Sequence, residues 1–272
     1  MKMAFATCVQ LGLSCIEEVY RIGGEFALLI TLKDEKGKSS SGRVYLDDVS
    51  DRHGVPLIKV DNINDVEVIR ALGRYEIDWL FIIGWSQIAK SEILAAPARG
   101  CIGMHPTLLP VGRGRAAIPW AIIKGLSQTG VTLFKLDEGV DTGDIIGQGV
   151  IEIGENTTAT SLYKQVEEMH KSLISKYWSE IVSDQLTLTK QDEARASEWP
   201  ARRPQDGRLL STMTMEEADR LVRAVTHPYP GAFYVDGDRT LRIWSAKADS
   251  DQGEIRLSDG FLAPVDYEID GQ

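Results

Sequence analysis

Residues 102–148 read IGMHPTLLPVGRGRAAIPWAIIKGLSQTGVTLFKLDEGVDTGDIIGQ, and the rest of the chain is organised around this stretch. It places His105 in a turn bounded by Pro106. After the apolar run at 131–136 it carries four acidic residues among eight, interrupted by two glycines. Short strands followed by loops rich in His, Asp, Arg and Gly are typical of α/β enzymes, which present their chemistry at strand ends. The stretch therefore predicts an α/β fold with a site built on these loops.

Apolar segments and helical periodicity alternate on both sides of this stretch. Residues 79–84, WLFIIG, form the continuous apolar strand that is typical of a buried parallel sheet. Further strands are expected at 1–10, 26–32, 56–60, 99–104, 131–136 and 145–153, and helices at 12–21, 44–53, 62–72, 116–124 and 157–183. Ser14 is the expected cap of the first helix, Asn62 or Asn64 that of the third, and 33–43 an expected surface loop. The alternation predicts a Rossmann-like, open, mostly parallel sheet of six or seven strands with helices on both faces.

The character of the sequence changes around residues 192–208, which are polar and irregular. We place the domain boundary here, with a catalytic domain at 1–190 and a small α+β subdomain at 191–272. Residues 215–225 are amphipathic, and Thr214 is positioned to cap them. Alternating stretches at 232–235, 240–246 and 254–257 predict hairpins.

Composition limits the partners. The formal net charge is −10, and residues 191–272 hold ten Lys/Arg against sixteen Asp/Glu. An acidic chain disfavours nucleic acid as a main partner, because phosphates attract cations. Cys8, Cys15 and Cys101 show no metal spacing, which favours buried, reduced thiols in a cytoplasm. With no signal peptide and no run of membrane-spanning length, we expect a cytoplasmic protein without a metal or a membrane partner.

Three groups of residues have the chemistry of a site. His105 at a strand end suits acid–base work near neutral pH, and Asp141 beside it would fix its tautomer. Arg113 and Arg115 suit phosphate or carboxylate binding. Each also has a plain structural explanation: a turn His bonded to main chain, a solvated acidic turn, and ordinary surface charge. The dinucleotide fingerprint and the Walker-type loop are absent from the sequence, so composition alone leaves an α/β enzyme of unassigned chemistry.

Taken together, these segments resemble the 10-formyltetrahydrofolate-dependent formyltransferases. The similarity is carried by MHPTLLP at 104–110, RG at 113–114, TGVTL at 129–133 and DEGVDTG at 137–143. That family includes methionyl-tRNA formyltransferase, glycinamide ribonucleotide formyltransferase and sugar N-formyltransferases. The resemblance covers about residues 1–190 and is strongest at 78–148. The family's catalytic His and Asp match His105 and Asp141, which lie 36 residues apart as is usual in the family.

The resemblance implies two binding regions and no metal. The formyl donor is expected between segments 81–88 and 136–141. The matching donor-site residues are Ile83, Gly84, Trp85, Gln87, Ile88, Leu136, Asp137, Glu138 and Asp141. The matching acceptor-site residues are Met104, Pro106, Thr107, Arg113, Gly114 and Arg115.

One catalytic position departs from the family pattern. The family reads Ile-Asn-x-His, whereas this chain has Gly103 two residues before His105. The Asn donates a hydrogen bond to the developing oxyanion, and losing one such donor typically costs about 10²–10³ in rate. Either another donor has replaced it, or the protein binds the folate without transferring the formyl group.

The segments at 113–116 and 223–233, with Trp120 and Trp244, are similar to those of sugar N-formyltransferases. The resemblance therefore implies formyl transfer from 10-formyltetrahydrofolate to the amine of an amino sugar, either nucleotide-activated or a nonulosonate precursor. His105 would stabilise the oxygen or relay a proton, and Asp141 would orient it and help to take the amine proton. Three alternatives remain: a methionyl-tRNA or amino-acid-type formyltransferase, a formate-releasing hydrolase, and a folate-binding regulatory module. The sugar and the oligomeric state are left open, with a homodimer as the candidate assembly.

Overall fold

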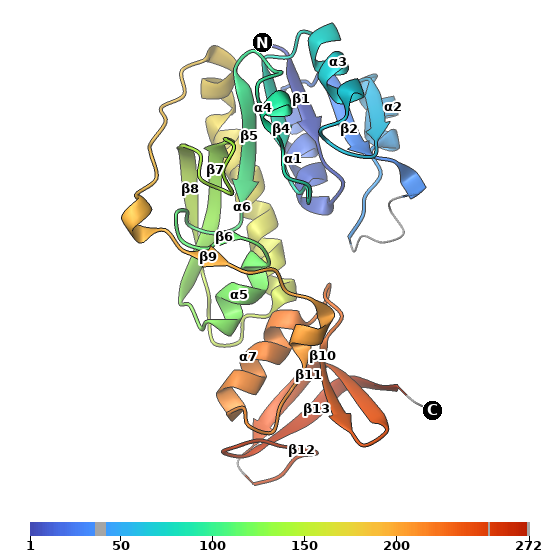
Figure 1. The fold of residues 1–272 in the computed structure, drawn as a ribbon, viewed down its shortest axis with the longest axis vertical. Coiled ribbons are helices and arrows are strands. Elements are labelled where there is room, and N and C mark those ends of the chain that lie inside the picture. The colour runs from blue at the N-terminus through green and yellow to red at the C-terminus, as the bar shows by residue number, and fades with distance from the viewer. Residues whose placement is uncertain (36–41, 250, 271–272) are drawn as a thin grey trace. The chain divides into compact units, whose positions relative to one another are not determined.

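The computed structural model describes residues 1–35, 42–249 and 251–270 (Figure 1). The expected surface loop at 33–43 falls largely on residues 36–41, which lie outside the described residues. The helices are α1 (Gln10–Arg21), α2 (Asp47–His53), α3 (Val66–Arg74), α4 (Ser91–Leu94), α5 (Ala117–Ile123), α6 (Ala159–Ser183) and α7 (Met215–Val225). The strands are β1 (Met3–Ala6), β2 (Leu28–Leu32), β3 (Leu57–Val60), β4 (Trp79–Ile82), β5 (Gly100–His105), β6 (Arg113–Gly114), β7 (Gln128–Lys135), β8 (Ile145–Glu152), β9 (Glu198–Trp199), β10 (Ala232–Asp236), β11 (Arg239–Asp249), β12 (Ile255–Arg256) and β13 (Phe261–Asp270).

A seven-stranded sheet has the order β3-β2-β1-β4-β5-β7-β8. Strands β1 to β5 pair in parallel, and β7 runs antiparallel to β5 with His105 opposite Thr132. The predicted open, mostly parallel sheet of six or seven strands is therefore confirmed, with seven strands. The reversal at β7 brings an antiparallel strand alongside the strand that carries His105.

Both faces of this sheet are buried, which explains why its strands are apolar throughout. Successive residues of a strand point to opposite faces. Ala4 and Ala6 of β1 lie in a core cluster with Val68 and Leu72 of α3. Between them, Phe5 stacks on Phe81 of β4, and Phe81 stacks in turn on Trp178 of α6. Helices therefore cover the sheet on both sides, and the framework that carries the site is a packed core.

The C-terminal part contains α7 and a four-stranded antiparallel sheet with the order β10-β11-β13-β12. The small α+β subdomain is confirmed, as is Thr214 as the cap of α7, whose side chain accepts a hydrogen bond from the Glu217 amide. The ten-residue strand β13 was not predicted. Pro264 argues against a strand interior, whereas residues 265–270, VDYEID, alternate apolar and acidic side chains as a strand does.

Two predicted helix caps were wrong. Helix α1 begins at Gln10, so Ser14 lies inside the helix, where its hydroxyl bonds to Glu167. Helix α3 begins after Asp65, and Asn62 lies in the preceding turn, where its backbone N–H donates to the Asp65 carboxylate and its side-chain Oδ1 accepts from the Asn64 backbone N–H. In both cases a Ser or Asn that suits a cap is bonded elsewhere.

The described chain forms two compact units that do not follow the sequence continuously. The first comprises residues 1–113, 130–150 and 166–198, and the second comprises 114–129, 151–165 and 199–272. The segment 191–198 groups with the first unit, together with all the predicted site residues except Gly114 and Arg115. The domain boundary at residue 190 stays a prediction about the sequence.

Candidate active site

His105 is the last residue of β5, and its imidazole is almost entirely buried. Its Nε2 lies 2.8 Å from the carbonyl oxygen of Gly112. A carbonyl only accepts hydrogen bonds, so Nε2 carries a hydrogen and donates it. In the neutral ring Nδ1 is then the unprotonated nitrogen. The main-chain contact therefore sets the tautomer and leaves Nδ1 as the atom that can take up a proton.

The other side of the ring faces Asp141. Nδ1 of His105 lies 3.5 Å from Oδ2 of Asp141, and the two side chains are 9% and 19% exposed. A proton held by Nδ1 would be attracted to this carboxylate at close range in a shielded environment. The pair can therefore hold one additional proton as an imidazolium between a carbonyl and a carboxylate.

The loop that carries Asp141 reaches His105 by an unexpected route. Segments 81–88 and 136–141 were expected to converge at the carboxyl edge of a parallel sheet. For segment 136–141 that expectation was wrong. Because β7 is antiparallel to β5, Lys135 pairs with Ile102, and the Leu136 amide bonds to the Cys101 carbonyl. The loop therefore leaves β7 near the start of β5 and folds back along that strand to reach His105.

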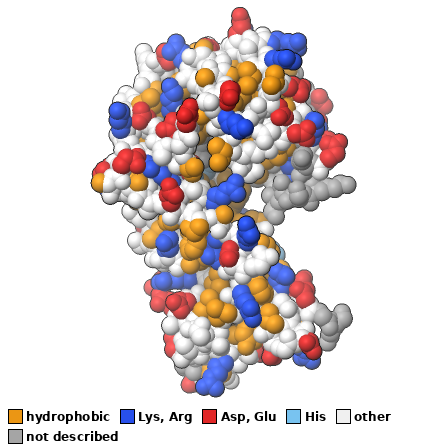
Figure 2. Space-filling model, in the orientation of Figure 1, with side chains coloured by type: hydrophobic (Ala, Val, Ile, Leu, Met, Phe, Trp, Pro, Cys, Tyr) orange, Lys and Arg blue, Asp and Glu red, His pale blue; other side chains and the backbone are white. Residues whose placement is uncertain are grey.

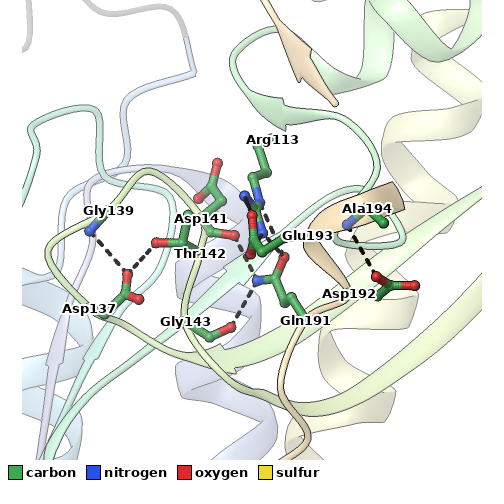
Figure 3. A network of polar contacts seen from close by, with 10 residues as sticks. All are labelled: Arg113, Asp137, Gly139, Asp141, Thr142, Gly143, Gln191, Asp192, Glu193 and Ala194. Atoms are coloured by element: carbon green, nitrogen blue, oxygen red, sulfur yellow. Dashed lines mark hydrogen bonds and ion pairs between the residues drawn. The ribbon is translucent and has the colours of Figure 1, made fainter. Parts of the chain in front are cut away.

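Local hydrogen bonds hold the returning loop (Figure 3). Oδ1 of Asp137 accepts bonds from the Gly139 amide at 3.1 Å and from the Thr142 hydroxyl at 2.7 Å. Asp141 has a φ of +56°, a left-handed conformation that non-glycine residues seldom adopt. At Gly143 a Cβ would lie 1.7 Å from the Lys135 carbonyl oxygen, so a side chain there has no room. The Gly and Asp residues of the motif are thus explained by the turn that they form.

Leu136 occupies the space beside Gly103. A Cβ on Gly103 would lie 2.7 Å from Cδ2 and 3.2 Å from Cγ of Leu136. An amide side chain at position 103 would therefore collide with Leu136. The glycine and the leucine fit one another, and the position expected to carry the family's Asn is closed by an apolar side chain.

The predicted donor-site segment after β4 is held by one amide side chain. Oε1 of Gln87 accepts bonds from the Trp85 indole at 3.0 Å and the Ile63 amide at 2.9 Å, and Nε2 donates to the Asp61 carbonyl. Trp85 is half-buried against the core, as is Leu136. The remaining predicted donor-site residues differ in exposure. Ile83 is buried, and Gly84 has a φ of +67°. Ile88 is 66% exposed, and Asp137 and Glu138 are also exposed. The contact roles of these residues stay predictions.

The predicted acceptor-site residues fall into two environments. Arg113 is buried, and its guanidinium forms a bidentate ion pair with Glu193. Nη2 lies 2.6 Å from Oε1 and Nη1 lies 2.9 Å from Oε2. These hydrogen bonds lower the pKa of the Glu193 carboxyl and raise that of Arg113. The Thr107 hydroxyl is buried and has no hydrogen-bond partner among the described residues. Met104 and Pro106 are half-buried, Gly114 has a φ of +104°, and Arg115 is exposed. Substrate binding by this group also stays a prediction.

Three contributors to the site were not predicted. Gly112 fixes the His105 ring through its carbonyl, and Gln191 and Glu193 contact Arg113. Glu193 lies in the segment interpreted as a linker and Gln191 directly precedes it, and no periodicity connects residue 191 to residue 141. A fourth residue, His170 of α6, is 1% exposed, and its Nδ1 donates to the Val166 carbonyl at 2.7 Å. Burial lowers the pKa of His170 to about 4, with the charge of His105 acting in the same direction and the Val166 contact opposing it.

The described residues show neither a metal-binding cluster nor a membrane span. No group of three or more His, Cys, Asp or Glu side chains there is arranged to hold a metal ion. Within the same residues, no helix has the length and apolar character needed to span a membrane.

Comparison with known proteins gives consistent matches. A model of the "Formyl transferase" family matches residues 22–177, and a model of the "Formyl transferase, C-terminal domain" matches residues 202–264. A methionyl-tRNA formyltransferase from Lachnospira eligens is 27% identical over 262 residues, which is 95% of this chain and 82% of that protein.

Two solved structures extend the comparison. The N-formyltransferase from Helicobacter canadensis, in complex with folinic acid and dTDP-3-aminofucose, superposes with a TM-score of 0.72 at 19% identity. The match covers 99% of this chain and 98% of that one. Phosphoribosylglycinamide formyltransferase from Bacillus halodurans gives a TM-score of 0.59 at 26% identity, covering 67% of this chain and 96% of that one.

Proposed function

The chain belongs to the formyl transferase family, and we propose that it formylates the primary amine of an amino sugar. The resemblance noted on the His105 and Asp141 motifs is thereby confirmed, and the protein is a formyltransferase-family enzyme that moves a formyl group from a formyl-tetrahydrofolate. The identity of the acceptor is the proposal.

The described residues suit 10-formyltetrahydrofolate as the donor. Its pterin ring has flat apolar faces and a polar edge with N–H donors. Trp85 and Leu136 offer half-buried apolar surface, and Asp137 and Glu138 supply exposed carboxylates. When bound, the donor supplies a formyl carbon that an amine can attack. We assign Trp85 and Leu136 to the ring faces and the acidic pair to its polar edge.

The catalytic residues deal with the proton that the amine must lose. As the nitrogen bonds to the formyl carbon, the nitrogen becomes more acidic, and a nearby base can take its proton. Nδ1 of His105 is that base in our proposal, and the Asp141 carboxylate stabilises the resulting imidazolium at 3.5 Å. Because Leu136 closes the position of the expected Asn, the N–H formed at Nδ1 also stabilises the oxyanion that develops from the formyl oxygen. The bond from the formyl carbon to the donor nitrogen then breaks, and the proton on Nδ1 passes to that nitrogen.

The negative charge of the chain is the observation that favours an amino sugar over a tRNA as the acceptor. The net charge is −10, and residues 191–272 have ten basic against sixteen acidic side chains. On the face drawn in Figure 2, Lys and Arg side chains lie interspersed with Asp and Glu. A tRNA needs many cations along its phosphates, whereas a sugar nucleotide needs only a few. The Helicobacter canadensis protein, crystallised with dTDP-3-aminofucose, shares this fold.

A second candidate is a methionyl-tRNA formyltransferase. The 27% identity to the Lachnospira eligens protein over 95% of this chain favours it. A folate-binding module without transfer activity is a third, and the Gly103–Leu136 packing favours that one. The three differ in what they formylate: a small amine, a charged tRNA, or nothing.

One experiment separates these candidates. The protein is incubated with 10-formyltetrahydrofolate and either a panel of nucleotide-linked amino sugars or methionyl-tRNA, and each acceptor is analysed for the mass gain of one formyl group. We expect the gain on an amino sugar, and its loss in His105→Ala. Formylation of methionyl-tRNA alone would overturn the sugar assignment. Donor binding with no formylated product would identify a binding module.

A further inference from the structure

Gln191 joins the two loops that hold the catalytic pair. Its Nε2 donates to the carbonyl oxygens of Asp141 at 2.7 Å and Gly143 at 2.8 Å. Its Oε1 accepts bonds from Nε of Arg113 at 3.2 Å and from Nη2 at 2.8 Å. An amide side chain offers two N–H donors and two lone pairs, and all four are used here. Figure 3 shows this side chain between the acidic loop and Arg113.

The contacts of Gln191 close a ring that includes both catalytic side chains. Arg113 follows Gly112, whose carbonyl receives Nε2 of His105 at 2.8 Å. The other nitrogen of His105 faces Asp141 at 3.5 Å, and Asp141 returns through its own carbonyl to Gln191. The order of the ring is His105, Asp141, Gln191, Arg113 and Gly112. A displacement of any of these residues would therefore change the distance between His105 and Asp141.

Arg113 is a firm anchor for this ring. Glu193 holds the guanidinium with two charge-assisted hydrogen bonds, and the Arg113 side chain is 5% exposed. The Arg113 amide donates to the Ser197 carbonyl at 2.9 Å, and the Gly112 amide donates to the Ser197 hydroxyl at 3.0 Å. The side of the ring that carries Gly112 is thus fixed independently of the acidic loop.

The acidic loop needs an external support at Asp141. A non-glycine residue with a φ of +56° is in a sparsely populated conformation, which persists only when its surroundings hold it. Gln191 grips the carbonyl of that residue and the carbonyl two positions later. The bonds made by Asp137 go to the Gly139 amide and the Thr142 hydroxyl, on either side of Asp141, and neither is to the Asp141 carbonyl that Gln191 holds.

We infer that Gln191 is a positioning residue that holds the Asp141 carboxylate against Nδ1 of His105. The inference rests on the proposed function, because it assigns Gln191 a part in the same reaction. Gln191 acts through Asp141 and does not touch the reacting atoms in this assignment. A misplacement of about 1 Å in such a site can lower a rate about 10²-fold.

Three variants isolate this role. Gln191→Leu removes every bond of the side chain. Gln191→Glu keeps acceptors for Arg113 but removes the N–H donors and places a carboxylate beside the Asp141 and Gly143 carbonyls. Lys190→Ala is the matched control, because Lys190 is the exposed neighbour of Gln191 on the chain. We expect kcat to fall about 10²-fold in both Gln191 variants, with an unchanged KM for the formyl donor, and to stay at the wild-type value in Lys190→Ala.

A double-variant cycle separates positioning from general stabilisation. If Gln191 acts through Asp141, Gln191→Leu should have little further effect on kcat in an Asp141→Asn background. A full additional 10²-fold loss in that background would overturn the inference, as would wild-type activity in Gln191→Glu.

A readout without turnover keeps this test apart from the proposed function. The imidazole ¹⁵N chemical shifts of His105, identified by their absence in His105→Ala, are measured at a fixed pH without substrates. We expect the shifts of Gln191→Leu to move from the wild-type values toward those of Asp141→Asn. If the shifts move so but no amine is formylated by the wild type, the proposed acceptor is wrong and the inference stands. Wild-type shifts in Gln191→Leu would overturn the inference.

Discussion

Gly103 and Leu136 pack so closely that a side chain at residue 103 would meet the leucine: a Cβ there would lie 2.7 Å from Cδ2 of Leu136. The leucine side chain sits where the family's Asn would project from β5. Gly103 lies on β5 and Leu136 directly follows the antiparallel neighbour β7, with the Leu136 amide bonded to the Cys101 carbonyl. The space beside position 103 is therefore filled by an apolar side chain.

This packing decides how Asn would behave at position 103. In Gly103→Asn the new side chain has to displace Leu136, and overpacking of this kind typically costs about 1–3 kcal/mol. We expect a lower free energy of unfolding and a lower kcat than in the wild type. In Gly103→Asn/Leu136→Ala the collision is removed, and kcat should rise above that of the single variant. Urea unfolding and steady-state kinetics of both proteins measure this, and a single variant as stable and as active as the wild type would contradict it.

Without the Asn, His105 has two roles in the proposed reaction. It takes up the amine proton at Nδ1 and stabilises the developing oxyanion with the N–H so formed, so His105→Ala should lower kcat by at least about 10³. Thermal unfolding of the variant serves as the control for folding, because the imidazole also bonds to Gly112. A folded variant with a rate near that of the wild type would show that the catalytic assignment is wrong.

Asp141 offers a cleaner substitution. Asn tolerates the left-handed conformation as well as Asp does, so Asp141→Asn should keep the φ of +56° and the turn. It removes the negative charge that stabilises a proton on Nδ1, and we expect kcat to fall by at least about 10²-fold with little change in thermal stability. Asp144→Asn is the comparison within the same loop and should have a much smaller effect. Equal losses in the two variants would mean that the charge of the loop as a whole is what matters.

The sheet and the catalytic pair were predictable for different reasons. The continuous apolar segments around Phe5 and Phe81 predict buried strands directly, because both faces of the sheet are covered. The His105–Asp141 pair came from motif resemblance, since no periodicity places residue 141 near residue 105. The strand before Asp141 was expected to be parallel to its neighbours, and β7 is antiparallel to β5.

The features of the site that were not predicted are contacts between residues that lie far apart along the chain. Gln191 and Asp141 are separated by 50 positions and joined by a bond from a side chain to a main-chain carbonyl. Leu136 was expected to contact the donor, and its fit to Gly103 follows only from the register of β7 on β5. Such pairs carry no local signature, and a single sequence offers no other signal for them.

Trp85 tests the donor site. Its half-buried ring is assigned to the face of the pterin, so Trp85→Ala should weaken binding of a folate ligand by about 10-fold or more through lost apolar contact. Gln87 would lose its indole partner but keep its bonds to Ile63 and Asp61. Calorimetric titration with 5-formyltetrahydrofolate measures the effect, with Val66→Ala, a change at an exposed position, as the control. Greater weakening of acceptor binding than of folate binding would place the ring elsewhere.

His170 should make the stability of the protein depend on pH. Burial lowers its pKa to about 4 in the folded protein, against an ordinary value of 6.5. Between these values the unfolded chain binds a proton that the folded chain does not, so the free energy of unfolding falls as the pH drops. The contribution is complete above pH 6.5, is lost progressively toward pH 4, and does not change further below it.

The shift corresponds to about 3 kcal/mol over that range, at about 1.4 kcal/mol for each pKa unit. We expect His170→Leu to remove this dependence, so that its stability relative to the wild type improves steadily from pH 7 to pH 4. Urea unfolding at a series of pH values measures the difference, in which the groups common to both proteins cancel. Met169→Leu on the same helix alters packing without removing a titratable group, and its difference from the wild type should be constant with pH. A constant difference for His170→Leu as well would show that the buried ring is not what titrates.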